Sequence, residues 1–135
     1  MPLDPERALT GAILAQLRAD AAVSAVLSGR VYDQPPVEPE YPLLLIGRSQ
    51  SRPFGGVAGE GVEHTLTLTV SSRYDGAEEA RRAAGLVRAA LDDAALSLTD
   101  HRLISLRITF VDTFRAADWR TTFSVVRLRA VTEPL

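Results

Sequence analysis

The side chains of this sequence that could support acid–base chemistry are two histidines and the carboxylate beside one of them. His64 lies on the apolar side of an alternating segment, Glu63–Arg73, and a lone histidine there is usually a hydrogen-bonded core residue. Asp100 and His101 are adjacent in the chain, and adjacent residues seldom face each other productively. No motif supplies the serine or cysteine nucleophile that a base would activate. We therefore expect no catalytic residues.

Metal and cofactor sites are not expected either. The carboxylate doublets Glu78-Glu79 and Asp92-Asp93 lack the spacing of a calcium-binding loop. The chain has no cysteine and no lysine, which removes thiolate metal sites and the lysine of a Walker loop. Glycines 55, 56, 59 and 61 do not stand between a strand and a helix, as a dinucleotide fingerprint requires. A small enzyme or ligand-binding module, which would have to use His64 or the Asp100-His101 pair, is kept as an alternative.

The composition describes one folded domain. The chain has 135 residues and 46% of them are hydrophobic, which favours a single core and argues against disorder. No apolar run approaches the roughly 18 residues of a membrane span, and the first residues do not resemble a signal peptide, so no membrane contact is expected. All 15 basic residues are arginine, yet the net charge is −2. This balance argues against sequence-specific or general binding of nucleic acid.

The first part of the chain is predicted to be helical. In residues 4–27, apolar side chains recur every four residues at Leu9, Ile13 and Leu17. Asp4 is placed to cap this helix, and Asp20 to cap a second short turn. Ser28-Gly29 is expected to end it, because glycine accepts the left-handed conformation common at helix ends.

A second helix is predicted at about residues 76–93, with Asp75 as its cap and an alanine-rich stripe toward the core. Alternation of apolar and polar residues, or a continuous apolar run, predicts strands elsewhere. In one of these, strict alternation places Ile104, Leu106, Ile108 and Phe110 on a single face. The predicted fold class is α+β: one domain of residues 1–135, with a mostly antiparallel sheet of about four to five strands and both helices packed on one face. The predicted strands are Arg30–Asp33, Leu43–Ile46, Val62–Ser72, Leu103–Phe114 and Arg120–Thr132.

Residues 47–61, GRSQSRPFGGVAGEG, form the longest stretch without a regular pattern and are expected to be a flexible loop. The loop is either a hairpin tip without a role or an arm that becomes ordered on a partner. Because a sheet that does not close leaves two edges exposed, we expect the strand edges and this loop to contact other copies of the chain. The alternative is a monomer whose edges are protected by proline and charge. The predicted interface residues are Arg48, Arg52, Phe54, Thr65, Thr67, Thr69, Arg107 and Arg127.

Five blocks of the sequence, in this order along the chain, are similar to a known protein family. They are LSGRVYDQPP (Leu27–Pro36), YPLLLIG (Tyr41–Gly47), EHTLTLTV (Glu63–Val70), AEEARRAAGLVRAAL (Ala77–Leu91) and HRLISLRI (His101–Ile108). With this set, the chain resembles the small tail-completion or tail-terminator proteins of long-tailed bacteriophages and of the gene transfer agents of alphaproteobacteria. The likeness runs from about residue 8 to residue 133.

The resemblance implies a structural virion protein with no catalytic residues and no cofactor. Such proteins form a ring, typically hexameric, on the head-proximal end of the tail tube, where the ring stops tail polymerisation. The implied partners are other copies of the chain, the tail tube protein, the head connector or stopper protein, and DNA that passes non-specifically through the lumen. The implied location is the tail of a virion or virus-like particle assembled in the bacterial cytoplasm. Another connector component, such as a stopper or adaptor, is the alternative within the same machine.

Overall fold

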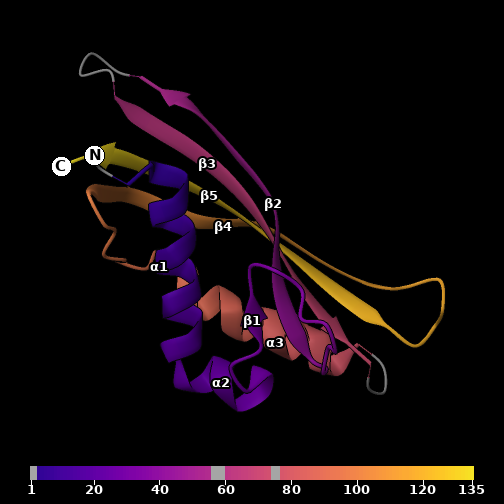
Figure 1. The fold of residues 1–135 in the computed structure, drawn as a ribbon. Helices are drawn as coiled ribbons and strands as arrows, with labels where there is room; N and C mark the ends of the chain where they lie inside the picture. Colours follow the sequence, from indigo (N-terminus) through magenta and orange to yellow (C-terminus); the bar gives the residue numbers. More distant parts are fainter. Residues whose placement is uncertain (1–2, 56–59, 74–76) are drawn as a thin grey trace.

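A computed structural model describes residues 3–55, 60–73 and 77–135 of the chain. Within these residues a twisted five-stranded sheet carries three helices on one of its faces (Figure 1). The strand order is β1-β2-β3-β5-β4, and in this part of the chain β1 pairs parallel with β2 while the other neighbours pair antiparallel. The predicted α+β class with a mostly antiparallel sheet is confirmed. The elements are α1 (Pro5–Ala19), α2 (Ala21–Leu27), β1 (Val31–Tyr32), β2 (Leu43–Phe54), β3 (Gly61–Ser72), α3 (Glu78–Leu91), β4 (His101–Arg115) and β5 (Thr122–Pro134).

The start of the chain folds as its capping residues predict. The Asp4 carboxylate accepts hydrogen bonds from the backbone N–H groups of Glu6 and Arg7, and the Asp20 carboxylate accepts one from Val23. Helix α2 ends where Ser28 and Gly29 take positive φ values of 52° and 76°. Among the described residues no single helix is long and apolar enough to cross a membrane, although α1 and α2 reach that length and composition when counted together across their 81° bend.

Helix α3 lies on the inner face of the sheet and supplies much of the core. Its stripe of small side chains, including Ala80, Ala84 and Val87, is buried and allows the helix to approach β3, β4 and β5 closely. The cap assigned to α3 is Ala77, which makes no side-chain capping bond; the predicted cap, Asp75, lies outside the described residues. The core that α1, α2 and α3 share with the sheet contains Leu9, Ile13, Leu17, Leu27, Leu44, Leu66, Leu68, Val70, Leu91, Leu106, Val126 and Leu128.

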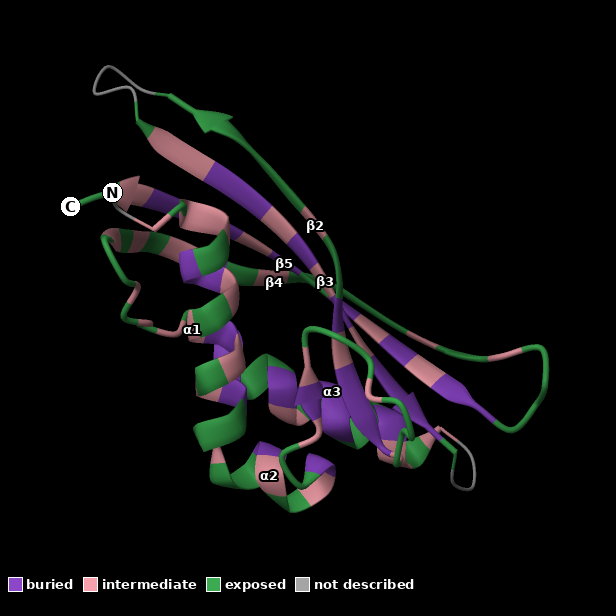
Figure 2. Ribbon diagram, in the orientation of Figure 1, coloured by how far each residue is buried: buried purple, intermediate pink, exposed green. Residues whose placement is uncertain are grey.

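Strands β2 and β3 form a long hairpin, and this corrects the predicted loop at 47–61. Residues 47–54 belong to β2, which pairs with β3 until Phe54 lies opposite Gly61. The outer half of β2 is almost entirely exposed (Figure 2). Neither of its faces therefore shows the alternation of apolar residues that indicates a strand in a sequence. Pro53 is tolerated because this half of β2 is a sheet edge. Of the predicted loop, residues 56–59 lie outside the described residues.

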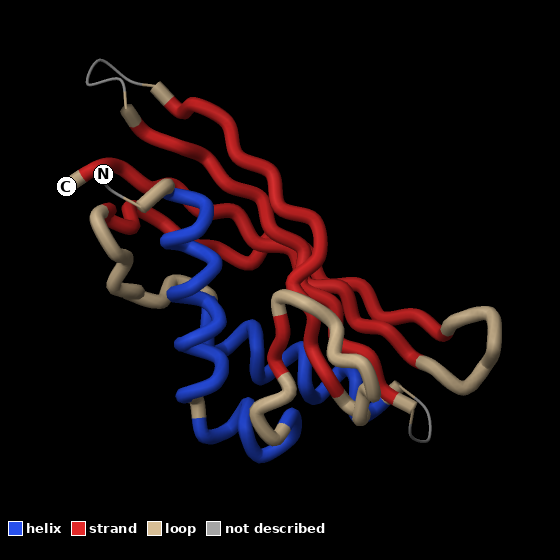
Figure 3. Tube along the Cα trace, in the orientation of Figure 1, coloured by secondary structure: helices blue, strands red, loops and turns tan. Residues whose placement is uncertain are grey.

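Strand β4 contains two bulges that overturn the predicted assignment of its faces. The register with β5 shifts between Leu103 and Ser105, and again between Ile108 and Phe110. Each shift gives β4 one extra residue, so the strict alternation of its side chains is broken. Leu106 is buried as expected, but Ile104 and Phe110 are 53% and 44% exposed. Toward the turn that joins them, β4 and β5 project past the helices as a second long hairpin (Figure 3).

We predict that Gly85→Ala raises the free energy of unfolding by about 1 kcal/mol, because alanine loses less backbone entropy than glycine inside a helix. The added Cβ at Gly85 would stand in open space. Gly29→Ala is the matched control: its Cβ would also find open space, but its φ of 76° disfavours any side chain. That variant should lose about 1 kcal/mol. Urea unfolding of the three proteins measures both changes, and a less stable Gly85→Ala would contradict this account of α3.

Candidate interaction surface

His64 is a structural residue of the sheet. Its ring is fully buried, and its Nδ1 and Nε2 atoms each lie 2.9 Å from a hydroxyl oxygen, of Ser51 on β2 and of Thr132 on β5. Burial lowers the pKa of His64 below its usual 6.5, because the charged ring would lose its hydration. The histidine therefore ties three neighbouring strands together as a neutral ring.

The Asp100-His101 pair also serves the fold. The Asp100 carboxylate accepts a hydrogen bond of 2.6 Å from the backbone N–H of Leu3, and the His101 Nε2 atom lies 2.6 Å from the Leu3 carbonyl oxygen. Both side chains thus hold the residue that precedes α1. They face the backbone of Leu3 rather than each other, so the alternative of an acid–base pair finds no support in this geometry.

The doublet Asp92-Asp93 joins the end of α3 to the edge of β4. The Asp92 carboxylate accepts hydrogen bonds from the backbone N–H of Ile108 at 2.9 Å and from the Arg107 Nε at 3.1 Å. The backbone N–H of Asp93 donates to the carbonyl oxygen of Leu106. The bond from Ile108, together with Arg107, lowers the pKa of Asp92. This stretch of the β4 edge is therefore covered by the chain itself.

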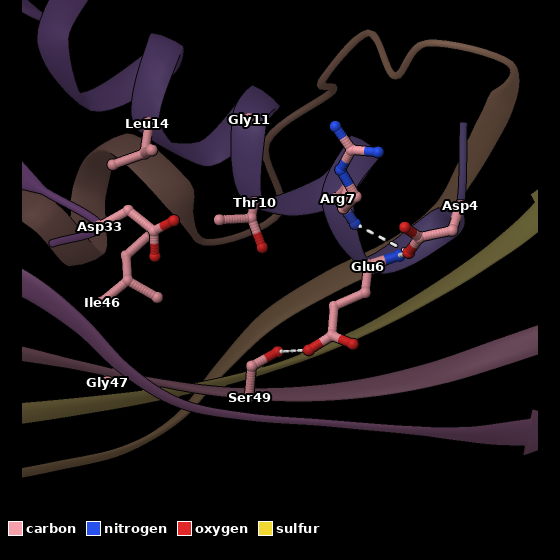
Figure 4. A pocket seen from close by; sticks show the side chains of 10 residues that line it. All are labelled: Asp4, Glu6, Arg7, Thr10, Gly11, Leu14, Asp33, Ile46, Gly47 and Ser49. Carbon is pink, nitrogen blue, oxygen red and sulfur yellow. Dashed lines mark hydrogen bonds between the residues drawn. The ribbon is translucent and has the colours of Figure 1, made fainter.

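A hollow of about 410 Å³ lies between the first turns of α1 and strand β2 (Figure 4). Three of its polar side chains already have partners: the Ser49 hydroxyl donates to the Glu6 carboxylate, and the Asp4 carboxylate caps α1. These contacts hold the start of α1 against β2. In residues 3–55, 60–73 and 77–135, no group of three or more histidine, aspartate or glutamate side chains is placed to hold a metal ion.

The outer face of the sheet, opposite the helices, gathers most of the predicted interface residues. The strand registers place Thr65 beside Arg129, Thr67 beside Arg127, and Thr69 beside Val125, so the threonine row of β3 lies next to a row on β5. These threonines are half-buried among their neighbours. A row of hydroxyl groups beside arginines suits a wet, hydrogen-bonding contact.

Glu63 is the centre of charge on this face. Its carboxylate lies 2.6 Å from the guanidinium nitrogens of both Arg52 on β2 and Arg129 on β5, and only 10% of its side chain is exposed. The hydrogen bonds from Arg129 and then Arg52 lower the pKa of Glu63. The Arg129 guanidinium also lies over the Phe54 ring, at 5.4 Å from its centre. The cluster links both strands of the β2–β3 hairpin to the neighbouring strand β5.

The outer face continues into aromatic side chains on the β4–β5 hairpin. Arg127 lies 4.9 Å from the centre of the Phe110 ring, and the rings of Phe114 and Phe123 are 5.7 Å apart. Phe110 and Phe114 are nearly half exposed, and Trp119 in the turn is 75% exposed. Large apolar side chains gathered on a projecting hairpin are typical of a protein contact site.

The structure separates two of the predicted interface residues from the rest. Arg48 lies in the bulge of β2 between Ile46 and Ser49 and is exposed, whereas Arg107 is paired with Asp92 at the opposite edge of the sheet. Sequence reasoning missed Glu63 and Arg129 as partners, and it also missed the aromatic hairpin. Strict alternation predicts Phe110 on the same face as Leu106, and the bulges of β4 place it on the outer face instead.

Comparison with known proteins agrees with this architecture. A family model described as tail completion protein gp17 matches residues 11–133. The structure is similar to a chain in the virion of a native gene transfer agent particle, with a TM-score of 0.87, 29% sequence identity, and coverage of 94% of this chain and 96% of that chain. No curated protein sequence matches this chain.

We predict that Glu63→Gln removes part of the acid sensitivity of the fold. Because the pKa of Glu63 is lowered from 4.5 in the folded state, its contribution is present above pH 4.5 and is lost as the pH falls through the lower folded value. The variant should be less stable than the natural protein above pH 4.5, and the difference should shrink in acid. Urea midpoints measured across this range test the prediction. Glu133→Gln, which removes an exposed pair with Arg102, is the control; an equal effect there would contradict the special position of Glu63.

Proposed function

Because this chain belongs to the tail completion protein gp17 family, we propose that it forms a ring at the head-proximal end of a phage-like tail tube. As a member of this family, the chain is a structural protein of a virion tail. In the proposed role the ring ends tail polymerisation and joins the tail to the head connector. The observation that carries the proposal is the family match over nearly the whole chain, together with the likeness to a chain of a gene transfer agent virion.

The architecture supports a role in assembly. The edge of β4 is open outside the stretch that Asp92 and Asp93 cover. The outer half of β2 is open as well, because β1 pairs with β2 only at Leu44 and Leu45. Such edges are commonly covered by pairing with another chain. A closed ring is the outcome when one surface of a copy binds a different surface of the next copy and the rotation closes.

In the proposed ring, the two hairpins provide surfaces that can contact the proteins above and below the ring. They project from opposite ends of the sheet, one carrying the Glu63 cluster and the other carrying Phe114 and Trp119 (Figure 1). We infer that the aromatic hairpin binds a protein partner, either the tail tube or the connector. DNA would pass through the lumen without sequence-specific contacts, in keeping with a net charge of −2.

Deletion of the gene tests the role directly. Electron microscopy of the resulting particles should show overlong tails, because nothing would stop tube growth. Separate filled heads beside tails of normal length would instead favour the stopper or adaptor role. Normal complete particles without the protein would contradict both roles.

We predict that Phe114→Ser combined with Trp119→Ser lowers the yield of complete particles at least about tenfold, since exposed aromatic side chains at a contact often contribute more than 1.4 kcal/mol. The single variant Trp119→Ser should change the free energy of unfolding of the isolated protein by less than about 0.5 kcal/mol, because the Trp119 side chain is mostly exposed. Particle counts and thermal unfolding measure the two effects.

The control for the aromatic variant is Leu135→Ser, which removes an apolar side chain that is also mostly exposed but lies outside the hairpin. It should leave the particle yield unchanged. A normal yield from the aromatic variant would show that this hairpin is not a docking surface.

A further inference from the structure

A groove of about 410 Å³ lies between α3 and the free part of β4, on the helix side of the sheet. Ala84 and Gly85 form its wall on α3, and Val111 lies across from them on β4. Arg81 and Arg88, one on each side of Gly85 along the helix, place two positive charges at the groove, and Thr113 on β4 adds a hydroxyl group. The groove therefore fits a small apolar side chain that has acidic residues near it in sequence.

Gly85 keeps this groove open at a cost to the fold. A glycine inside a helix is less stable than alanine there, yet a Cβ at position 85 would meet no neighbouring group. Packing within the chain therefore does not require glycine at this position. Close approach of another chain would require it, because any side chain at position 85 would occupy the space that the groove provides.

An acidic segment of the same chain has the complementary character. Residues 33–40, DQPPVEPE, connect β1 to the start of β2, and Val37 within them is 100% exposed. Glu38 and Glu40 are exposed and form no ion pair with another described residue. Three prolines stiffen the segment, so little conformational entropy would be lost when it binds.

We propose that the groove of one copy takes residues 33–40 of the neighbouring copy, with Val37 beside Gly85 and with Glu38 and Glu40 paired to Arg81 and Arg88. This inference rests on the proposed ring and names the contact between its subunits. The segment follows β1 and the groove borders β4, which are the first and last strands in the sheet order. The two complementary surfaces therefore lie at opposite edges of one copy, as a head-to-tail ring requires.

The two parts of the contact have different roles. Burial of Val37 in the groove supplies apolar contact area, while the acidic and basic pairs at the rim fix the direction and register of the segment. A tail tube or connector protein is the alternative occupant of the groove, and the charge match between residues 33–40 and the groove favours a second copy of this chain.

The absence of cysteine from the chain allows a direct test of this contact. The double variant Val37→Cys, Gly85→Cys should form disulfides between copies when assembled particles are oxidised, because the proposed contact brings the two Cβ atoms within the short distance that a disulfide needs. Each copy then carries one cysteine for each neighbour. A denaturing gel without reductant should show a ladder of multimers beyond the dimer.

Matched variants control for random cross-linking. Val37→Cys alone should give no ladder, and Val37→Cys with Arg82→Cys should give none either, because Arg82 lies on α3 but does not line the groove. If the Val37→Cys, Gly85→Cys variant enters particles but runs only as a monomer on the gel, the proposed contact is overturned.

Charge exchange tests the same contact if the cysteine variant fails to enter particles. Glu38→Arg with Glu40→Arg should lower incorporation at least about tenfold, and so should Arg81→Glu with Arg88→Glu. The fourfold variant should recover most of the loss, whereas Arg82→Glu should cause none. Loss without recovery in the fourfold variant, or no loss in either pair, would overturn the contact.

The outcomes separate this inference from the proposed function. Overlong tails in the deletion strain, a ring in natural particles and no Val37–Gly85 cross-link would leave the function in place and move the subunit contact elsewhere. Natural particles in which the protein forms no ring would overturn both.

Discussion

The structure depends on one constraint: its strands are longer than the helices that cover them. Strand β4 has 15 residues and extends about 50 Å at the rise of a β-strand, whereas the 14 residues of α3 span about 21 Å. The interior strands β3 and β5 bury their inner face, whereas long stretches of β2 and β4 remain exposed. The ends of the strands continue as hairpins whose hydrogen bonds are made but whose side chains remain open to partners. An assembly protein benefits from this division, because its core is complete while its contact surfaces are not.

The parts of the fold that could be predicted are those governed by local signals or by burial. Asp4, Asp20 and Gly29 mark helix ends through backbone chemistry that needs no tertiary context. Strand β3 alternates clearly because it lies in the middle of the sheet with one face on the core. The outer half of β2 has no buried face, so its strand conformation follows from pairing with β3 and leaves no trace in the sequence pattern.

The surface chemistry was harder to predict because it depends on register. Glu63 meets Arg52 and Arg129, which are 11 and 66 residues away in the chain. The sequence shows three charges on three segments, and only the alignment of β2, β3 and β5 turns them into one cluster. The same holds for Phe110, whose place on the outer face depends on a bulge. The family resemblance predicted the class of protein, but it could not predict these contacts.

The exposed Trp119 has a practical consequence. It is the one tryptophan of the chain, and it lies in the turn of the β4–β5 hairpin with the Arg115 guanidinium 5.7 Å from the centre of its ring. Indole emission responds to the polarity around it, so the intrinsic fluorescence of this protein reports the surroundings of a single turn. Mixing the unlabelled chain with purified tail tubes would give an optical signal from that turn, once the fluorescence that the tubes emit by themselves is subtracted.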